Sequence, residues 1–155
     1  MDSPQNHIWG PRLWLILHSA AERIGGKHLK RLPQEESRIW SNLLSSLRYS
    51  LPCPQCKKHY TSYYGSNPLS TFNREFIRDW LYVLHCQVNN RTEKQNTVSI
   101  DKIPEIYGQP FNFSEHFAVT SKEMVKALRI GWVTREDIQR TVRCFEELKR
   151  FYDFF

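Results

Sequence analysis

Apolar residues recur at intervals of three and four positions along most of the 155-residue chain, which is the period of an amphipathic helix. The pattern predicts helices over residues 8–24 and 33–51, which end at Gly25-Gly26 and before Pro52. It predicts two more over residues 53–65 and from about 70 to 89, separated by the breaker Asn67-Pro68. Patterns that alternate apolar and polar residues, as strands do, are scarce. We therefore expect an all-α fold, a helical bundle.

The last third of the chain has a different character. Residues 90–110 are polar, contain prolines and a glycine and show no sustained period, so we expect a long connection there. Thr120 and Glu123 have the spacing of a capping box, which predicts the start of a short helix that ends near residue 130. Thr134 is expected to cap a final helix that ends near Tyr152.

The size of the chain indicates one domain. A chain of 155 residues, 40% of them hydrophobic, can close a single core. We expect residues 1–94 to form the helical core that carries the function. Residues 95–155 should add the connection and C-terminal helices, packed on the same domain.

Composition excludes several classes of protein. The 22 Lys and Arg residues give a net charge of +6 but form no dense block, so nucleic-acid binding is not expected. No window approaches the roughly 18 apolar residues needed to cross a bilayer, so we expect no membrane insertion. The polar N-terminus does not resemble a secretory signal, and we expect a cytoplasmic protein.

The chemistry of the chain centres on one close pair of cysteines, Cys53 and Cys56, at the predicted start of a helix. A disulfide is sterically easy across this spacing, and the helix dipole favours a thiolate on the first sulfur. His59 lies one turn beyond Cys56 on the same face, so one ligand could touch both. The pattern predicts a redox-active disulfide.

Other interpretations use the same cysteines. Position 57 is a lysine, which excludes a haem-attachment CxxCH motif. A thioredoxin-like site would need a strand before the motif, where the sequence is helical. A zinc site usually needs two close pairs, and Cys86 and Cys144 are isolated. We expect no metal, although a helical interaction module whose cysteine pair is structural or shares a metal with a partner remains the alternative.

Three motifs in order carry a resemblance to a known family. They are Trp9-Gly10-Pro11-x-x-Trp14-x-x-x-His18, Leu51-Pro52-Cys53-x-x-Cys56-x-x-His59 and Phe76-x-x-x-Trp80-x-x-x-x-His85-x-x-Val88-Asn89. Together they resemble the flavin-linked sulfhydryl oxidases related to the augmenter of liver regeneration, and most closely the short branch from large DNA viruses. The resemblance covers residues from about 8 to 94. It implies a four-helix bundle plus a short extra helix, with a helical C-terminal extension here.

The resemblance also implies the site. Cys53 and Cys56 would be the catalytic pair. FAD would contact residues of the first helix, the cysteine helix and the fourth helix with its exit, namely Gly10, Trp14, His18, Cys56, His59, His85, Val88, Asn89 and Lys94. Cys86 stands where the family usually has an asparagine, so one contact to FAD departs from the pattern.

The implied function is the oxidation of protein thiols to disulfides. Electrons would pass from the cysteine pair through FAD to dioxygen, giving hydrogen peroxide, and the family packs as a homodimer. The family commonly keeps a second cysteine pair as a shuttle, but no second CxxC is present in this sequence. We therefore expect a separate dithiol protein, a small redox relay, to deliver electrons, in the cytoplasm of a virus-infected cell or in the virion. A flavin-free module is the alternative.

Overall fold

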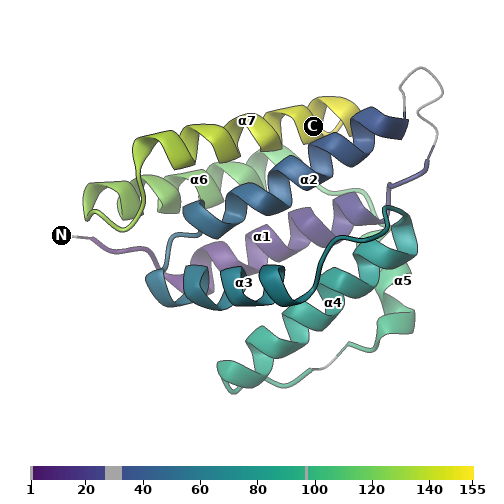
Figure 1. Ribbon diagram of the computed structural model, residues 1–155, viewed down its shortest axis with the longest axis horizontal. Helices are drawn as coiled ribbons and strands as arrows, with labels where there is room; N and C mark the ends of the chain where they lie inside the picture. Colours follow the sequence, from purple (N-terminus) through teal and green to yellow (C-terminus); the bar gives the residue numbers. More distant parts are fainter. Residues whose placement is uncertain (1, 27–32, 97) are drawn as a thin grey trace.

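The computed structural model describes residues 2–26, 33–96 and 98–155, and within them the chain is helical without strands (Figure 1). The all-α prediction is confirmed. The elements, in chain order, are α1 (Asn6–Ala21), α2 (Pro33–Ser50), α3 (Pro54–Ser66), α4 (Arg74–Arg91), the 3₁₀ helix η1 (Ile100–Lys102), α5 (Ile103–Tyr107), α6 (Phe113–Arg129) and α7 (Arg135–Tyr152). No helix among these residues is both long enough and apolar enough to span a bilayer.

The helices are arranged around α1 and α2. Helix α1 contacts α4 and α5 on one side and α6 on the other, while α2 contacts α3 and α7. Figure 1 shows α6 and α7 running alongside α1 and α2, with α3, α4 and α5 on the opposite side. The second half of α1 is buried at every position from 16 to 21, because it has neighbours on more than one side.

One hydrophobic core contains residues both from the part predicted to carry the function, residues 1–94, and from the C-terminal extension, residues 95–155. Phe113 and Phe145 of the extension belong to the same buried cluster as Trp40 and Leu43 of α2. The Trp40 indole Nε1 donates a buried hydrogen bond of 2.9 Å to the Tyr152 hydroxyl at the end of α7. The extension is therefore an integral part of the bundle.

Local signals set most helix ends, with some differences from the predictions. The side chain of Thr134 accepts from the Asp137 amide and caps α7, as predicted. Helix α1 ends at Ala21, a few residues before the predicted end. Helix α4 starts at Arg74, after the predicted start, because the Asn73 side chain caps it by accepting from an amide at 2.7 Å.

The predicted capping box at Thr120 is wrong. Helix α6 begins seven residues earlier, at Phe113, with the Asn112 side chain accepting from the Glu115 amide at 3.0 Å. Thr120 is buried in mid-helix, where its hydroxyl donates to the His116 carbonyl one turn back at 3.0 Å. The connection predicted over 90–110 is also shorter than expected, since it contains η1 and α5.

Candidate active site

Cys53 caps the start of the cysteine helix with its own sulfur. Its backbone is extended (φ −165°), and its Sγ accepts a hydrogen bond from the Cys56 amide at 3.2 Å. Pro54 occupies the first turn of α3, where no amide hydrogen is needed. Both cysteines are half-buried free thiols. The sequence therefore places a reactive pair at the positive end of a helix dipole.

The two sulfurs differ in acidity. A hydrogen bond from the Cys56 thiol lowers the pKa of the Cys53 thiol to about 5, against the opposing effect of burial, and the Cys56 backbone amide adds to the lowering. The same hydrogen bond raises the pKa of Cys56, with burial adding to the shift. In the reduced pair at neutral pH, Cys53 is therefore a thiolate and Cys56 keeps its proton.

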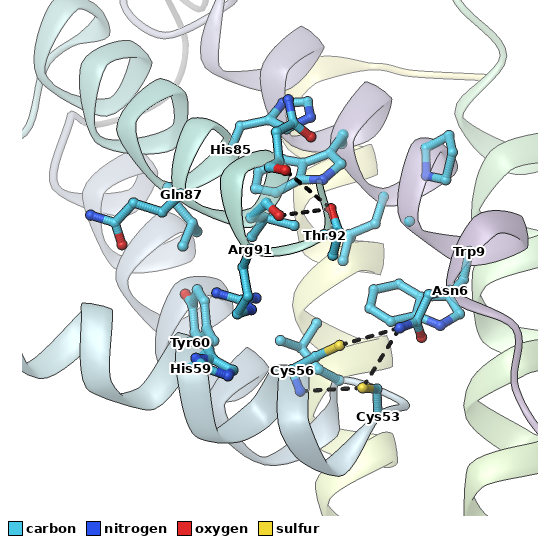
Figure 2. A pocket seen from close by; sticks show the side chains of 18 of the residues that line it. Asn6, Trp9, Cys53, Cys56, His59, Tyr60, His85, Gln87, Arg91 and Thr92 are labelled. Atoms are coloured by element: carbon cyan, nitrogen blue, oxygen red, sulfur yellow. Dashed lines mark hydrogen bonds between the residues drawn. The ribbon is translucent and has the colours of Figure 1, made fainter. Parts of the chain in front are cut away.

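The cysteine pair opens onto a cavity of about 430 Å³. Residues of α1, α2, α3, α4 and α5, together with some just after α2 and α4, line this cavity. Figure 2 shows the cysteines at one side of it, below α1 and α4. The volume lies within the range of roughly 300–1,000 Å³ typical of small-molecule sites. The cavity is suited to a ligand that contacts the sulfurs.

Most of the residues predicted to bind a cofactor line this same cavity. They come from three helices far apart in sequence and from the segment just after α4, and they are Gly10, Trp14, Cys56, His59, His85, Val88, Asn89 and Lys94. His18 is the exception, because it does not line the cavity but is buried behind His85. The structure thus brings the predicted set together around the cysteine pair.

The wall opposite the cysteines is a stack of rings. Trp14 and His85 stack face to face, with ring centroids 4.0 Å apart and an angle of 5° between the planes. His18 Nε2 lies 3.0 Å from His85 Nδ1, and the His18 ring stacks on Tyr107 at 4.6 Å. Burial lowers the pKa of His18 to about 3 and of His85 to about 4, so both rings are neutral at pH 7. The wall is flat, aromatic and uncharged.

Several lining residues were not predicted from the sequence. Arg91 reaches from the end of α4 toward His59 and Tyr60 in Figure 2. Burial, and next the charge of Arg91, lowers the pKa of His59. Tyr107 enters the cavity from α5, inside the predicted connection, and Pro104 near the start of that helix was the available signal. Asn6 lies beside the two sulfurs, and no local signal indicated it.

A metal centre finds no support in the described part of the chain. It contains no group of three or more histidine, cysteine or carboxylate residues placed to hold an ion. The cavity does contain cysteine and histidine side chains, the ligands that zinc prefers, but among the described residues they are not grouped closely enough to hold one ion.

Fold and site together define a class of protein: a small helical thiol redox protein whose cysteine pair opens onto a ligand cavity. Residues 11–108 match the model of the Erv1/Alr family. Because that span covers more than half of the 155 residues, the chain belongs to the Erv1/Alr family. The resemblance drawn from the three motifs is confirmed.

Viral proteins are among the relatives of the chain. An African swine fever virus protein (isolate Warthog/Namibia/Wart80/1980), described as an FAD-linked sulfhydryl oxidase, is 30% identical over 107 residues, covering 65% of this chain and 81% of its own. Its counterpart from isolate Pig/Kenya/KEN-50/1950 is 29% identical over the same length. A Frog virus 3 (isolate Goorha) protein is 31% identical over 103 residues, 64% of this chain and 66% of its own. No solved structure is a significant match to the chain.

Proposed function

We propose that the chain is an FAD-dependent thiol oxidase that generates disulfide bonds in protein substrates. The observation that carries this function is that Cys53 and Cys56 open onto the same cavity as the residues expected to hold the flavin. The viral relatives described as FAD-linked sulfhydryl oxidases support the same activity.

The cavity is chemically suited to FAD. The stacked faces of Trp14 and His85 offer a platform for a planar ring system. Arg91 and Lys94 line the cavity with cationic side chains that can pair with phosphates. Trp9 lines the cavity, and its buried Nε1 has no hydrogen-bond partner among the described residues, as expected where a ligand supplies one.

Several residues of this chain would together bind FAD. We assign this role to Gly10, Trp14, His18, Cys56, His59, His85, Val88, Asn89 and Lys94, with His18 acting from behind His85. When bound, the flavin supplies a two-electron acceptor that dioxygen can reoxidise, giving hydrogen peroxide.

The oxidised cysteine pair would take electrons from the substrate by thiol-disulfide exchange. A substrate thiolate attacks the Cys53 sulfur, the bond between Cys53 and Cys56 breaks, and its electron pair leaves on Cys56 as a thiolate facing the cavity. A second substrate thiolate then attacks the mixed disulfide, forms the substrate disulfide and releases Cys53. The substrate loses two electrons and the pair gains them. Once Cys56 takes up a proton, its thiol donates the hydrogen bond that stabilises the Cys53 thiolate.

The electron donor would be a separate protein. The sequence has one CxxC, so no second pair of this kind can carry electrons to it from within the chain. We propose that a small redox-relay protein with its own reactive dithiol docks over the turn of residues 51–56, and that this relay serves client proteins in the cytoplasm. Dioxygen would be the final acceptor.

A homodimer is the proposed assembly. Because α6 and α7 pack against α1 and α2, a dimer interface would have to use other faces of the bundle. Light scattering at micromolar concentration should give about twice the chain mass of 18.6 kDa. A mass near 18.6 kDa would contradict the dimer.

One absorbance spectrum followed by one assay tests the proposed function. The purified protein should be yellow with flavin absorbance, and it should consume dioxygen when given dithiothreitol or a reduced dithiol protein. Cys53→Ser should abolish this consumption. A colourless protein with stoichiometric zinc would exclude the oxidase in favour of a metal-binding interaction module.

A further inference from the structure

A side chain from another helix contacts both sulfurs of the cysteine pair. The Asn6 amide nitrogen, in the first turn of α1, lies 3.8 Å from Cys53 Sγ and 3.7 Å from Cys56 Sγ, within hydrogen-bonding range of sulfur. Figure 2 shows the Asn6 amide above the pair, with one dashed line to each sulfur. Since an amide nitrogen has two hydrogens, Asn6 can donate to both sulfurs at once.

The direction of these hydrogen bonds determines their effect. An amide nitrogen donates and cannot accept, so the contacts favour whichever sulfur carries negative charge. The Asn6 hydrogen bond lowers the pKa of Cys53, as does the larger hydrogen bond from the Cys56 thiol. During exchange the negative charge leaves on Cys56, and the same amide is in place to stabilise it.

The C-terminal extension holds Asn6 in this place. The preceding residue, Gln5, donates its backbone amide to Glu123 Oε1 of α6 at 3.1 Å. Glu123 is 2% exposed. The Lys126 ammonium lies 2.8 Å from the Glu123 carboxylate and 3.0 Å from the carboxylate of Asp2, so it joins the two residues. Pro4 in the same arm is buried. The arm that precedes α1 is therefore anchored on α6.

The extension also contacts the helix that carries the cysteines. The Lys57 ammonium, one residue after Cys56, donates to the backbone carbonyl of Trp132 in the turn between α6 and α7. Asn6 and α3 are thus both attached to the same C-terminal unit, which fixes the distance between the amide and the two sulfurs.

We propose that Asn6 is a third catalytic side chain, which stabilises the thiolate of the reduced pair and of the leaving sulfur and so makes the Cys53–Cys56 disulfide a stronger oxidant of substrate. Stabilising the reduced form of a dithiol raises its reduction potential. This role adds to the thiol-disulfide exchange described above and rests on the proposed function. It concerns only the cysteine pair, before any electrons pass to the flavin.

The test measures the cysteine pair directly under anaerobic conditions. The purified protein, with its flavin, is equilibrated in glutathione buffers of defined ratio, quenched with an alkylating agent and read by mass spectrometry. Asn6→Asp keeps the shape but replaces the donor with a negative acceptor. It should lower the equilibrium constant for reduction of the pair by about tenfold, and Asn6→Ala by roughly threefold. The pH midpoint of alkylation of Cys53 should rise in both.

Two further variants make the outcome specific. His7→Ala alters an exposed neighbour in the same turn of α1 and should leave the equilibrium and the midpoint unchanged. Asn6→Gln keeps an amide donor, so its equilibrium constant and its alkylation midpoint should lie between those of Asn6→Ala and the wild type. An Asn6→Asp protein with wild-type equilibrium and wild-type midpoint would overturn the role of Asn6. Because neither reading uses oxygen consumption, this result is separate from whether the chain proves to be an oxidase.

Discussion

His18 Nε2 and His85 Nδ1 lie 3.0 Å apart and form a hydrogen-bonded pair of neutral imidazoles that joins α1 to α4, with His85 in the cavity wall and His18 behind it. One ring must donate and the other accept, so the two facing nitrogens cannot both carry a proton, and protonation of both rings breaks the pair. Burial, with the neighbouring histidine adding to it, lowers the pKa of His18 to about 3. For His85, burial lowers the pKa to about 4.

This pair makes the fold sensitive to acid. Histidines in the unfolded chain bind protons below about pH 6.5, while the folded pair resists them, so stability is full above that pH and falls as the pH drops toward the folded values. We expect the free energy of unfolding to fall by on the order of 2 kcal/mol per histidine, or about 4 kcal/mol for the pair, between about pH 6.5 and about pH 4.5. Urea unfolding followed by circular dichroism measures it.

A comparison of variants isolates the histidine contribution. His18→Gln keeps a hydrogen-bonding side chain that does not titrate, and its stability should depend less on pH than that of the wild type. His7→Gln changes an exposed histidine and should keep the wild-type profile. Equal slopes for His18→Gln and the wild type would show that the pair does not cause the acid sensitivity.

The two cysteines should give different spectra when they are replaced singly. In Cys53→Ser, Cys56 is left as a free sulfur facing the cavity, so long-wavelength absorption between its thiolate and bound flavin should persist or increase. In Cys56→Ser that absorption should vanish while flavin stays bound. Both variants should lose more than about a hundredfold in oxidation of a protein dithiol. Oxidation by Cys56→Ser at the wild-type rate would refute the assigned roles.

The Tyr152 hydroxyl should stabilise the bundle by joining α7 to α2. It accepts from Trp40 Nε1 at 2.9 Å and donates to the Glu36 carboxylate, with all three residues buried. Tyr152→Phe leaves the indole and the carboxylate without this partner, so we expect a loss of about 1–3 kcal/mol in the free energy of unfolding. Chemical denaturation checks it, with the exposed Tyr49→Phe as a control that should change little. If Tyr152→Phe lost no more free energy of unfolding than Tyr49→Phe, the stabilising role of the Tyr152 hydroxyl would be contradicted.

The first four helices could be predicted because their signals are local. Breakers such as Pro52 and Asn67-Pro68 act on the neighbouring backbone, and the structure ends α2 and α3 beside them. The start of α6 could not be predicted in this way. Asn112 and Thr120 are both plausible caps, and the choice depends on burying Phe113, which is 1% exposed, against α7 and the main core.

The residues of the candidate site also fall into those that local sequence signals predict and those that they do not. Trp14 and His18 are four residues apart, as are His85 and Asn89, so helical spacing alone puts each pair on one face. Asn6 reaches cysteines 47 and 50 positions away, and Tyr107 reaches His18 from another helix. Contacts of this kind depend on how the helices pack, which periodicity does not determine.

The remaining two cysteines provide the last prediction, because neither is placed to act as a shuttle. Cys86 follows His85 on α4, but it is half-buried and does not line the cavity. Cys144 is buried in α7, and burial raises the pKa of its thiol, which lowers its reactivity at neutral pH. Electrons should therefore reach Cys53 directly from the substrate.

The double variant Cys86→Ser/Cys144→Ser tests direct transfer, with turnover measured on dithiothreitol and on a reduced dithiol protein. Rates within about twofold of the wild type on both substrates are expected, since neither sulfur takes part in the exchange. Each single variant serves as a control for folding, because Cys144 belongs to the main core. Selective loss of protein oxidation, with dithiothreitol turnover retained, would mean that one of these cysteines carries electrons to Cys53 after all.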